Sequence, residues 1–211
     1  TSIVLKGGCK LMGAILTNLR STVIVGLALT VVLFFIYQGH GGYEGSVLTK
    51  YIFRWLHVLS GVMWVVLLWY FNFVQIPNMP NIPDDQKPAI GKVIAPAALF
   101  WFRWAAKATL VTGLILAYLN GYLFEALTLG LMAPDIVAMH TAIGIGMWLG
   151  LIMWFNVWFV IWPNQKKALG IVDCAPEEKA KSAKTAMLFS RTNTLLSFPM
   201  LLTMVAAQNL Y

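Results

Sequence analysis

Long apolar runs alternate with short polar segments along most of this chain. Five of the runs approach the length of about 20 residues that a helix needs to cross a bilayer. Segments rich in glycine, proline and charged residues, such as "QGHGGYEG" and "PNMPNIPDDQKP", separate them. The pattern therefore predicts five transmembrane helices, at about 21–38, 48–76, 96–119, 134–162 and 188–208.

The composition favours the same class of protein. Of the 211 residues, 59% are hydrophobic and 11% are charged, which is too little charge to cover a soluble domain of this size. We therefore expect an all-α integral membrane protein with a single domain over residues 1–211. Residues 1–20 are expected to form a cytoplasmic or interfacial segment, because Lys6 and Lys10 interrupt an apolar stretch. Residues 21–208 are expected to form a five-helix bundle.

The charged residues indicate the partner and the orientation. The formal net charge is +7, but the basic residues lie in short blocks beside the apolar runs. We therefore expect the lipid bilayer, and no nucleic acid, as a partner. Most lysines and arginines precede the first run or lie between the second and third or the fourth and fifth runs. Because short cytoplasmic segments are rich in Lys and Arg, the sequence predicts a cytoplasmic N-terminus and a C-terminus outside.

The cysteines exclude several kinds of site. Cys9 and Cys174 are the two cysteines, and neither lies in a CxxC or CxxCH motif. This spacing excludes a zinc ribbon, a disulfide framework and covalently attached c-type haem within this sequence. The N-terminal residues show no signal-peptide cleavage pattern, so none is expected.

The second and fourth apolar runs share an ordered set of residues. Each contains His-x-x-x-Gly, then Met-Trp, Phe-Asn and Pro-Asn, with spacings that differ by one or two residues. One run separates the two, so their helices are expected to cross the membrane in the same direction. The sequence thus predicts that helices 2 and 4 form an imperfect parallel repeat. Its members are His57, Gly61, Met63, Trp64, Phe71, Asn72, Pro77 and Asn78 in the second run and His140, Gly144, Met147, Trp148, Phe155, Asn156, Pro163 and Asn164 in the fourth.

The two histidines of the repeat are candidate ligands. His57 and His140 are both expected about 10 Å below the outer surface, where they would face each other. Gly61 and Gly144 follow one helical turn deeper on the same face, where a flat macrocycle needs missing side chains. Since neutral imidazole ligates haem iron, we expect haem b between helices 2 and 4, with the two histidines as metal ligands. The alternative is that each histidine hydrogen-bonds a neighbouring helix.

Four further residues complete the predicted cofactor site. Arg54 shares a face with His57 and is expected to hold a haem propionate; the alternative is that it snorkels to the outer headgroups. Trp64 and Trp148 are expected to flank the macrocycle, with ordinary packing as the alternative. Lys107 lies near the middle of its run and is expected to face the bundle interior, close to a propionate, a substrate or a proton path.

Three other polar residues carry weaker expectations. Asn72 and Asn156 occupy corresponding positions in the repeat. They are expected to be polar neighbours of Lys107 or to form interhelical hydrogen bonds. His40 lies in a glycine-rich segment and is expected to be a solvated loop residue, with a gate or partner contact as the alternative.

Three stretches together resemble a known family: "RWLHVLSGVMWVVLLWYFNFVQIP", "MWFNVWFVIWPNQKK" and "SRTNTLLSFPMLLTM". They resemble the membrane domain of the bacterial membrane-bound urate oxidase (urate hydroxylase PuuD-type) family over most of residues 50–205. The resemblance implies a redox module in the bacterial inner membrane, joined in full-length members to a C-terminal cytochrome c domain that carries electrons from urate towards the respiratory chain. His57 matches the family's "RWLH" element, whereas Thr192 stands where the family's "SRHNT"-like motif has histidine. The "LH…G…W" pattern resembles, more weakly, the haem-binding HemJ-type protoporphyrinogen oxidases.

These observations lead to three hypotheses for the function. The first is a membrane electron-transfer module that binds haem b and exchanges electrons with a separate cytochrome c or a larger membrane complex. The second is a haem-free accessory subunit of a larger membrane complex. The third is a membrane oxidase that acts directly on urate or a porphyrin, with Arg103 and Lys107 meeting the anionic substrate.

Overall fold

The structure is a computed structural model, and it describes residues 13–132 and 137–211. Every regular element within these ranges is helical, which confirms the all-α prediction. The predicted interfacial segment falls mostly on residues 1–12 and so lies largely outside the described ranges. The α-helices are α2 Leu19–Gly41, α3 Gly45–Trp69, α4 Ile76–Asn78, α5 Lys87–Ala89, α6 Ala95–Asn120, α7 Leu123–Leu127, α8 Ala138–Phe155, α9 Trp162–Ala168 and α10 Pro176–Asn209. A 3₁₀ turn, η2, covers Met79–Asn81, and π-helical segments cover η1 Tyr70–Gln75, η3 Ile90–Ile94 and η4 Asn156–Ile161.

The chain divides into two units, Thr1–Leu48 and Thr49–Tyr211, and α2 is the long helix of the first. Its N-cap is Asn18, whose side-chain oxygen accepts hydrogen bonds from the backbone N–H groups of Arg20 and Ser21. The helix ends at Gly42, which adopts the left-handed conformation with φ 57°. His40 therefore lies in the last helical turn, where its Nδ1 is 2.9 Å from the carbonyl oxygen of Ile36. The prediction of a loop residue was wrong, because the helix continues to Gly41.

Four helical stretches in the described ranges are long and apolar enough to cross a membrane: Leu19–Gly41, Gly45–Asn81, Lys87–Asn120 and Ala138–Ala168. They correspond to the first four predicted spans. The fifth predicted span, 188–208, lies within α10 and does not meet the same criterion. Buried polar residues of α10 interrupt its apolar sequence, and these are Ser190, Asn193, Thr194 and Ser197. The prediction of five spans is therefore corrected to four in the part of the chain that the structure describes.

The polar segment before α10 is more helical than the sequence pattern indicated. Residues 163–184 were expected to connect two spans, but α9 and the first turns of α10 occupy most of this stretch. Pro176 stands in the first turn of α10, and Glu177 and Glu178 follow it. Proline and acidic residues both favour a helix N-terminus, and Lys167 of α9 forms an ion pair with Glu178.

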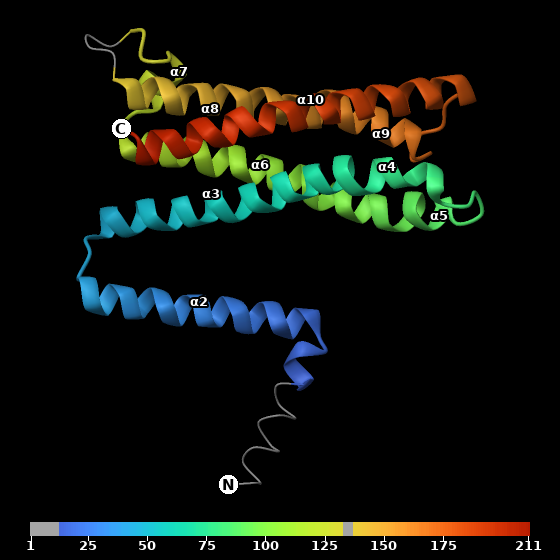
Figure 1. Cartoon of the computed structure of the whole chain (residues 1–211). Coiled ribbons are helices and arrows are strands. Elements are labelled where there is room, and N and C mark those ends of the chain that lie inside the picture. The colour runs from blue at the N-terminus through green and yellow to red at the C-terminus, as the bar shows by residue number, and fades with distance from the viewer. Residues whose placement is uncertain (1–12, 133–136) are drawn as a thin grey trace, which may run out of the picture. The chain divides into compact units, whose positions relative to one another are not determined.

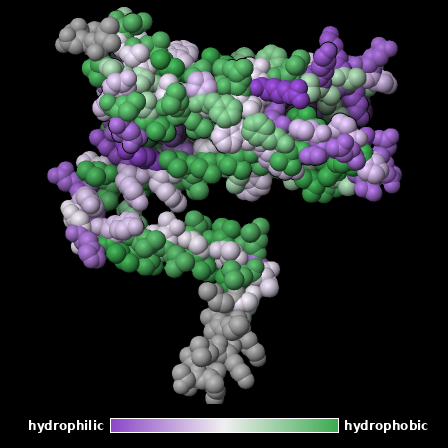
Figure 2. All heavy atoms as spheres, viewed as in Figure 1, coloured by the Kyte–Doolittle hydropathy of each residue, from purple (hydrophilic) through white to green (hydrophobic). Residues whose placement is uncertain are grey.

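The second unit is a bundle in which α10 lies along α8, with α6 and α3 beside them (Figure 1). Its main core joins α3, α6, the α8–η4 helix and α10. Trp64 is 2% exposed and belongs to this core, so it has the packing role that was the alternative to flanking a macrocycle. Hydrophobic residues cover much of the bundle's sides, whereas hydrophilic residues gather towards its two ends (Figure 2). This distribution suits contact with a lipid bilayer.

Both helices of the predicted repeat change from α- to π-helical geometry at corresponding points. The segment η1 contains Asn72 and η4 begins at Asn156, and both asparagines are buried. A π-helical turn is uncommon and often accompanies a functional or packing constraint. The shared position of these turns gives the sequence repeat a structural counterpart.

Two glycines of α8 have very different surroundings. A Cβ atom on Gly144 would overlap the carbonyl oxygen of Ala126 and lie 3.0 Å from Leu129 Cδ2. A Cβ atom on Gly150 would have nothing within 4 Å. The close approach of Ala126, on α7, therefore depends on the missing side chain at Gly144.

We expect Gly144→Ala to lower the free energy of unfolding by about 1–3 kcal/mol, because α7 must shift to admit the methyl group. The matched change Gly150→Ala should leave stability unchanged or raise it slightly, since alanine favours a helix over glycine. Unfolding of the purified protein in detergent measures both values. Equal effects of the two substitutions would contradict the packing of α7 against α8.

Candidate functional site

The two predicted haem ligands lie at different depths. His57 is twelve residues after Gly45, the first residue of α3, whereas His140 is two residues after Ala138, the first residue of α8. Both helices begin at the same end of the bundle (Figure 1). At 1.5 Å per residue, the ten-residue difference corresponds to about 15 Å along the bundle. The helix starts therefore do not support the expected equal depth, because α8 begins four residues later than its apolar run and α3 three residues earlier.

His57 makes an interhelical hydrogen bond. Its Nδ1 lies 2.9 Å from the carbonyl oxygen of Thr109 and 3.3 Å from Thr112 Oγ1, both on α6. Because a carbonyl oxygen only accepts, Nδ1 carries the proton and donates it. The ring also packs on Gly113, where an added Cβ would lie 2.8 Å from His57 Cε1. The contact is the one expected under the hydrogen-bonding alternative.

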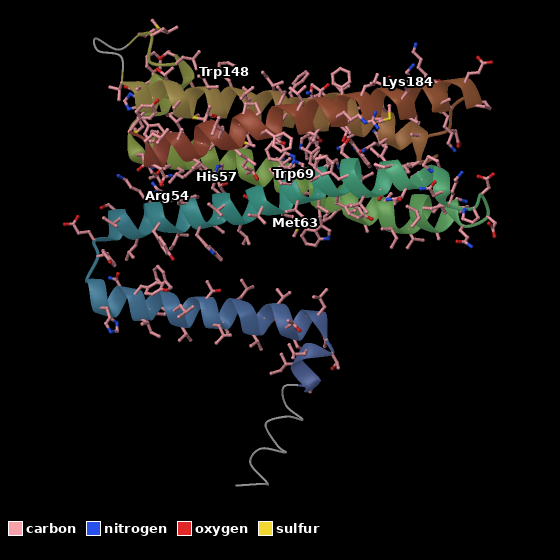
Figure 3. All side chains as sticks on the ribbon, in the orientation of Figure 1. Arg54, His57, Met63, Trp69, Trp148 and Lys184 are labelled. Atoms are coloured by element: carbon pink, nitrogen blue, oxygen red, sulfur yellow. The ribbon has the colours of Figure 1, made fainter. Side chains whose placement is uncertain are left out.

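His140 belongs to a different group of side chains. Its ring centroid is 6.0 Å from that of Tyr122, which is 8% exposed, and its Nδ1 is buried without a hydrogen-bond partner. Burial raises the pKa of the Tyr122 phenol, and the positive charge of Arg54 acts in the opposite direction. Arg54 of α3 lies on the side that faces the other bundle helices (Figure 3). We call Arg54, Tyr122 and His140 the α7-end cluster.

The spaces beside the two repeat glycines are occupied by protein. Thr109 Cγ2 lies 3.8 Å from the position of a Cβ on Gly61, and the carbonyl of Ala126 fills the space at Gly144. Together with the depth difference, this means that the described residues do not fit a haem ligated by both His57 and His140. No group of three or more metal-ligating side chains lies within the described ranges.

Trp148 and Lys107 also lie away from the predicted cofactor position. Trp148 is 42% exposed, and its indole Nε1 donates to the carbonyl oxygen of Leu127 at 3.0 Å. Lys107 is exposed rather than interior, and its Nζ lies 5.1 Å from the ring of Trp104 and 5.8 Å from that of Trp158. A lysine in a membrane helix is less costly when its long side chain reaches along the surface, which accounts for this placement.

A buried polar network joins the two repeat helices to α10. Asn72 Nδ2 donates to Ser190 Oγ at 2.8 Å. Asn156 Nδ2 donates to Asn193 Oδ1 at 2.8 Å, and Asn193 Nδ2 donates to the carbonyl oxygen of Met153 at 2.9 Å. The two repeat asparagines thus form interhelical hydrogen bonds, which was one of the two roles expected for them.

Two kinds of residue were missing from the sequence predictions. The partners on α10 follow a helical spacing of three and four residues at Ser190, Asn193 and Ser197, and Ser197 Oγ accepts from Trp69 Nε1 at 3.0 Å. This spacing could have revealed the polar face of α10. Tyr122 follows the left-handed Gly121 at the end of α6, and no spacing marks it as a partner of His140.

Thr192, at the position where the family that the sequence resembles has histidine, does not belong to this buried network. It is exposed, and its hydroxyl donates to the carbonyl oxygen of Leu188 at 3.1 Å within α10. The neighbouring Asn193 is 0% exposed. The departure from the family motif therefore falls outside the buried network.

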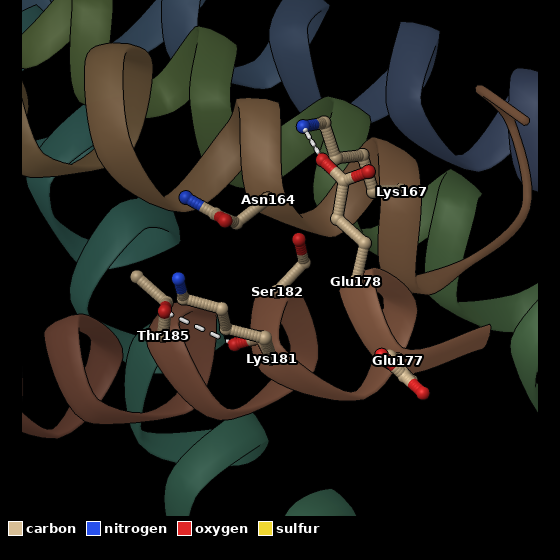
Figure 4. A pocket seen from close by; sticks show the side chains of 7 residues that line it. All are labelled: Asn164, Lys167, Glu177, Glu178, Lys181, Ser182 and Thr185. Carbon is tan, nitrogen blue, oxygen red and sulfur yellow. Dashed lines mark hydrogen bonds and ion pairs between the residues drawn. The ribbon is translucent and has the colours of Figure 1, made fainter. Parts of the chain in front are cut away.

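An open depression of about 510 Å³ lies between α9 and the start of α10 (Figure 4). Charges of both signs line it, and Lys167 and Glu178 neutralise each other in an ion pair. The hydroxyl of Thr185 donates to the carbonyl oxygen of Lys181 at 3.0 Å, as is usual within a helix. The depression thus has no excess charge or free buried group that selects a ligand.

These features define a helical membrane module in which α10 forms hydrogen bonds with both helices of the imperfect repeat. Residues 137–210 match the family model described as Urate oxidase N-terminal. The matched segment covers α8, η4, α9 and all of α10, and it includes His140, Asn156 and Asn193. The match supports a urate-oxidase-like relationship, which is the coarser part of the resemblance seen in the sequence. No curated protein and no solved structure matches the chain.

Asn193→Ala should lower the free energy of unfolding by about 1–2 kcal/mol, because it leaves Asn156 Nδ2 and the carbonyl of Met153 without their partner. Thr192→Ala, one residue away on the exposed face, is the control and should change stability little. Unfolding of both variants in detergent tests this prediction. A loss in Thr192→Ala as large as in Asn193→Ala would contradict it.

Proposed function

We propose that this chain is a membrane-embedded module of a urate-oxidase-like protein and that it binds a small planar anion, with urate as the first candidate, at the α7-end cluster. The observation that carries the proposal is the buried, unpartnered Nδ1 of His140 beside Tyr122. His140 lies within residues 137–210, which match the urate oxidase family model.

The chemistry of the α7-end cluster suits such a ligand. Urate carries a delocalised negative charge, with carbonyl oxygens and N–H groups around the edge of a flat ring. The guanidinium of Arg54 offers several N–H donors and a permanent positive charge. A buried imidazole nitrogen without a partner costs free energy until something supplies one. Arg54 is exposed, so a ligand can approach the cluster from its side.

The haem-based electron-transfer hypothesis receives less support from the same residues. It requires His57 and His140 at one depth, whereas their positions counted from the starts of α3 and α8 differ by ten residues, or about 15 Å along a helix. It also requires open space at Gly61 and Gly144, where Thr109 and Ala126 lie instead. We therefore derive no electron-transfer step through haem b, and a cytochrome c or larger complex as electron partner remains a prediction.

We also propose that the module resides in the bacterial inner membrane with the α7 end outside. Lysines concentrate at the opposite end, in α5, α9 and the first turns of α10, and these are Lys87, Lys166, Lys167, Lys179, Lys181 and Lys184. Cytoplasmic segments are enriched in such residues. A urate-like anion would then reach the α7-end cluster from outside the cell.

We expect Arg54→Gln to weaken urate binding about tenfold or more, because it removes a charge-assisted hydrogen bond worth about 1.5–3 kcal/mol. Lys50→Gln is the matched control, since it makes the same change of charge one turn earlier in α3. Binding of radiolabelled urate to the detergent-purified protein measures both. The proposal fails if wild type does not bind urate or if the two variants lose affinity equally.

A reduced-minus-oxidised absorption spectrum of the same preparation separates this proposal from its rival. We expect no b-type α-band in the wild-type protein. A band that disappears in both His57→Ala and His140→Ala would replace the anion-binding proposal with the electron-transfer hypothesis.

A further inference from the structure

Three basic side chains gather around tryptophans where α6 meets η4 and α9. Arg103 Cζ lies 3.3 Å from the ring centroid of Trp162, and Lys166 Nζ lies 5.7 Å from the same centroid. Lys107, one turn along α6 from Arg103, has its Nζ 5.1 Å from the ring of Trp104. The three cations thus come from two helices that are far apart in sequence, and they occupy one region of the surface.

No carboxylate neutralises these cations within the described ranges. The ion pairs there are Lys87 with Asp84 and Lys167 with Glu178. Arg103 makes no hydrogen bond or ion pair among the described residues, and its Nη1 is buried without a partner. A guanidinium with unmet donors is costly beside an apolar bundle, so an acceptor from outside the chain would stabilise this arrangement.

The surroundings indicate which kind of molecule supplies that acceptor. Phe100, Trp101 and Trp104 of α6 are 47%, 58% and 45% exposed, and they form an apolar surface next to the cations. Tryptophan is enriched where headgroups meet the hydrocarbon region. Basic pockets between transmembrane helices bind anionic lipid headgroups. A lipid fits both features, since its chains contact the aromatic residues while its phosphate meets the cations.

We propose that Arg103, Lys107 and Lys166 bind the phosphate of an anionic phospholipid at the surface where α6 meets η4 and α9. The guanidinium of Arg103 packs against Trp162 and carries a permanent charge with several N–H donors, which suit phosphate oxygens. The two lysines contribute charge without fixed geometry. The site lies away from the α7-end cluster, and it stands whether or not the chain binds urate.

The experiment uses the full chain in nanodiscs of phosphatidylcholine, with and without phosphatidylglycerol. Native mass spectrometry measures retained phosphatidylglycerol, and thermal unfolding measures its stabilising effect. We expect Arg103→Gln and Lys166→Gln each to weaken phosphatidylglycerol retention about fivefold, because each removes the attraction of one basic side chain to the anionic headgroup. Arg191→Gln is the control, because Arg191 is an exposed cation of α10 outside this region. It should behave as wild type.

Two results would overturn the proposal. One is an equal loss in Arg191→Gln, which would show attraction to the overall charge of the protein. The other is stabilisation of the phosphatidylcholine sample by millimolar inorganic phosphate to the same extent, which would assign the site to a free anion. If Arg103→Gln does not fold, Arg103→Lys keeps the charge but removes the fork. It should then retain an intermediate amount of lipid, and full retention would contradict the role of the guanidinium.

Discussion

The hydrogen bonds of Asn193 are the interaction on which the bundle most depends. This side chain is 0% exposed, and it connects the carbonyl of Met153 and the amide of Asn156 to α10. Helices in a membrane gain little from hydrophobic association, because lipid chains are as apolar as the side chains. Polar contacts and close packing must therefore set which helices meet and in which register. The bond from Asn72 to Ser190 makes the corresponding connection for α3, so one face of α10 holds both repeat helices.

The π-helical turns are understandable as part of this connection. A π turn departs from the regular hydrogen-bond pattern of the α-helix, and in lipid any backbone group left over must be satisfied inside the protein. Asn72 Nδ2 donates to the carbonyl oxygen of Leu68 at 2.9 Å as well as to Ser190. One amide thus serves the local backbone and the neighbouring helix. Asn156, at the start of η4, also donates to α10, through Asn193, so an amide donor at both points of the repeat connects its helix to α10.

The sequence predicted four of the membrane helices and the order of the repeat, because both depend on local patterns of apolar and polar residues. It did not predict the relative depth of His57 and His140, since helix starts are set by caps and neighbours that a hydropathy pattern does not contain. It also assigned the space at Gly144 to a cofactor. A missing side chain admits a protein neighbour equally well, and α7, a five-residue helix in an apparent loop, is that neighbour. Contacts between segments distant in sequence account for each of these errors.

The two ends of the bundle leave different polar groups unmet. His140 at one end lacks a partner for Nδ1, and Arg103 towards the other end lacks one for its guanidinium. Trp64, Leu68 and Phe102, each at most 2% exposed, belong to the tightly packed core of the same bundle. Since unmet polar atoms are costly beside lipid, both ends favour external ligands. The two proposed ligands, an anion at the α7 end and a lipid beside α9, would each supply the missing partner at one end and would bind independently of one another.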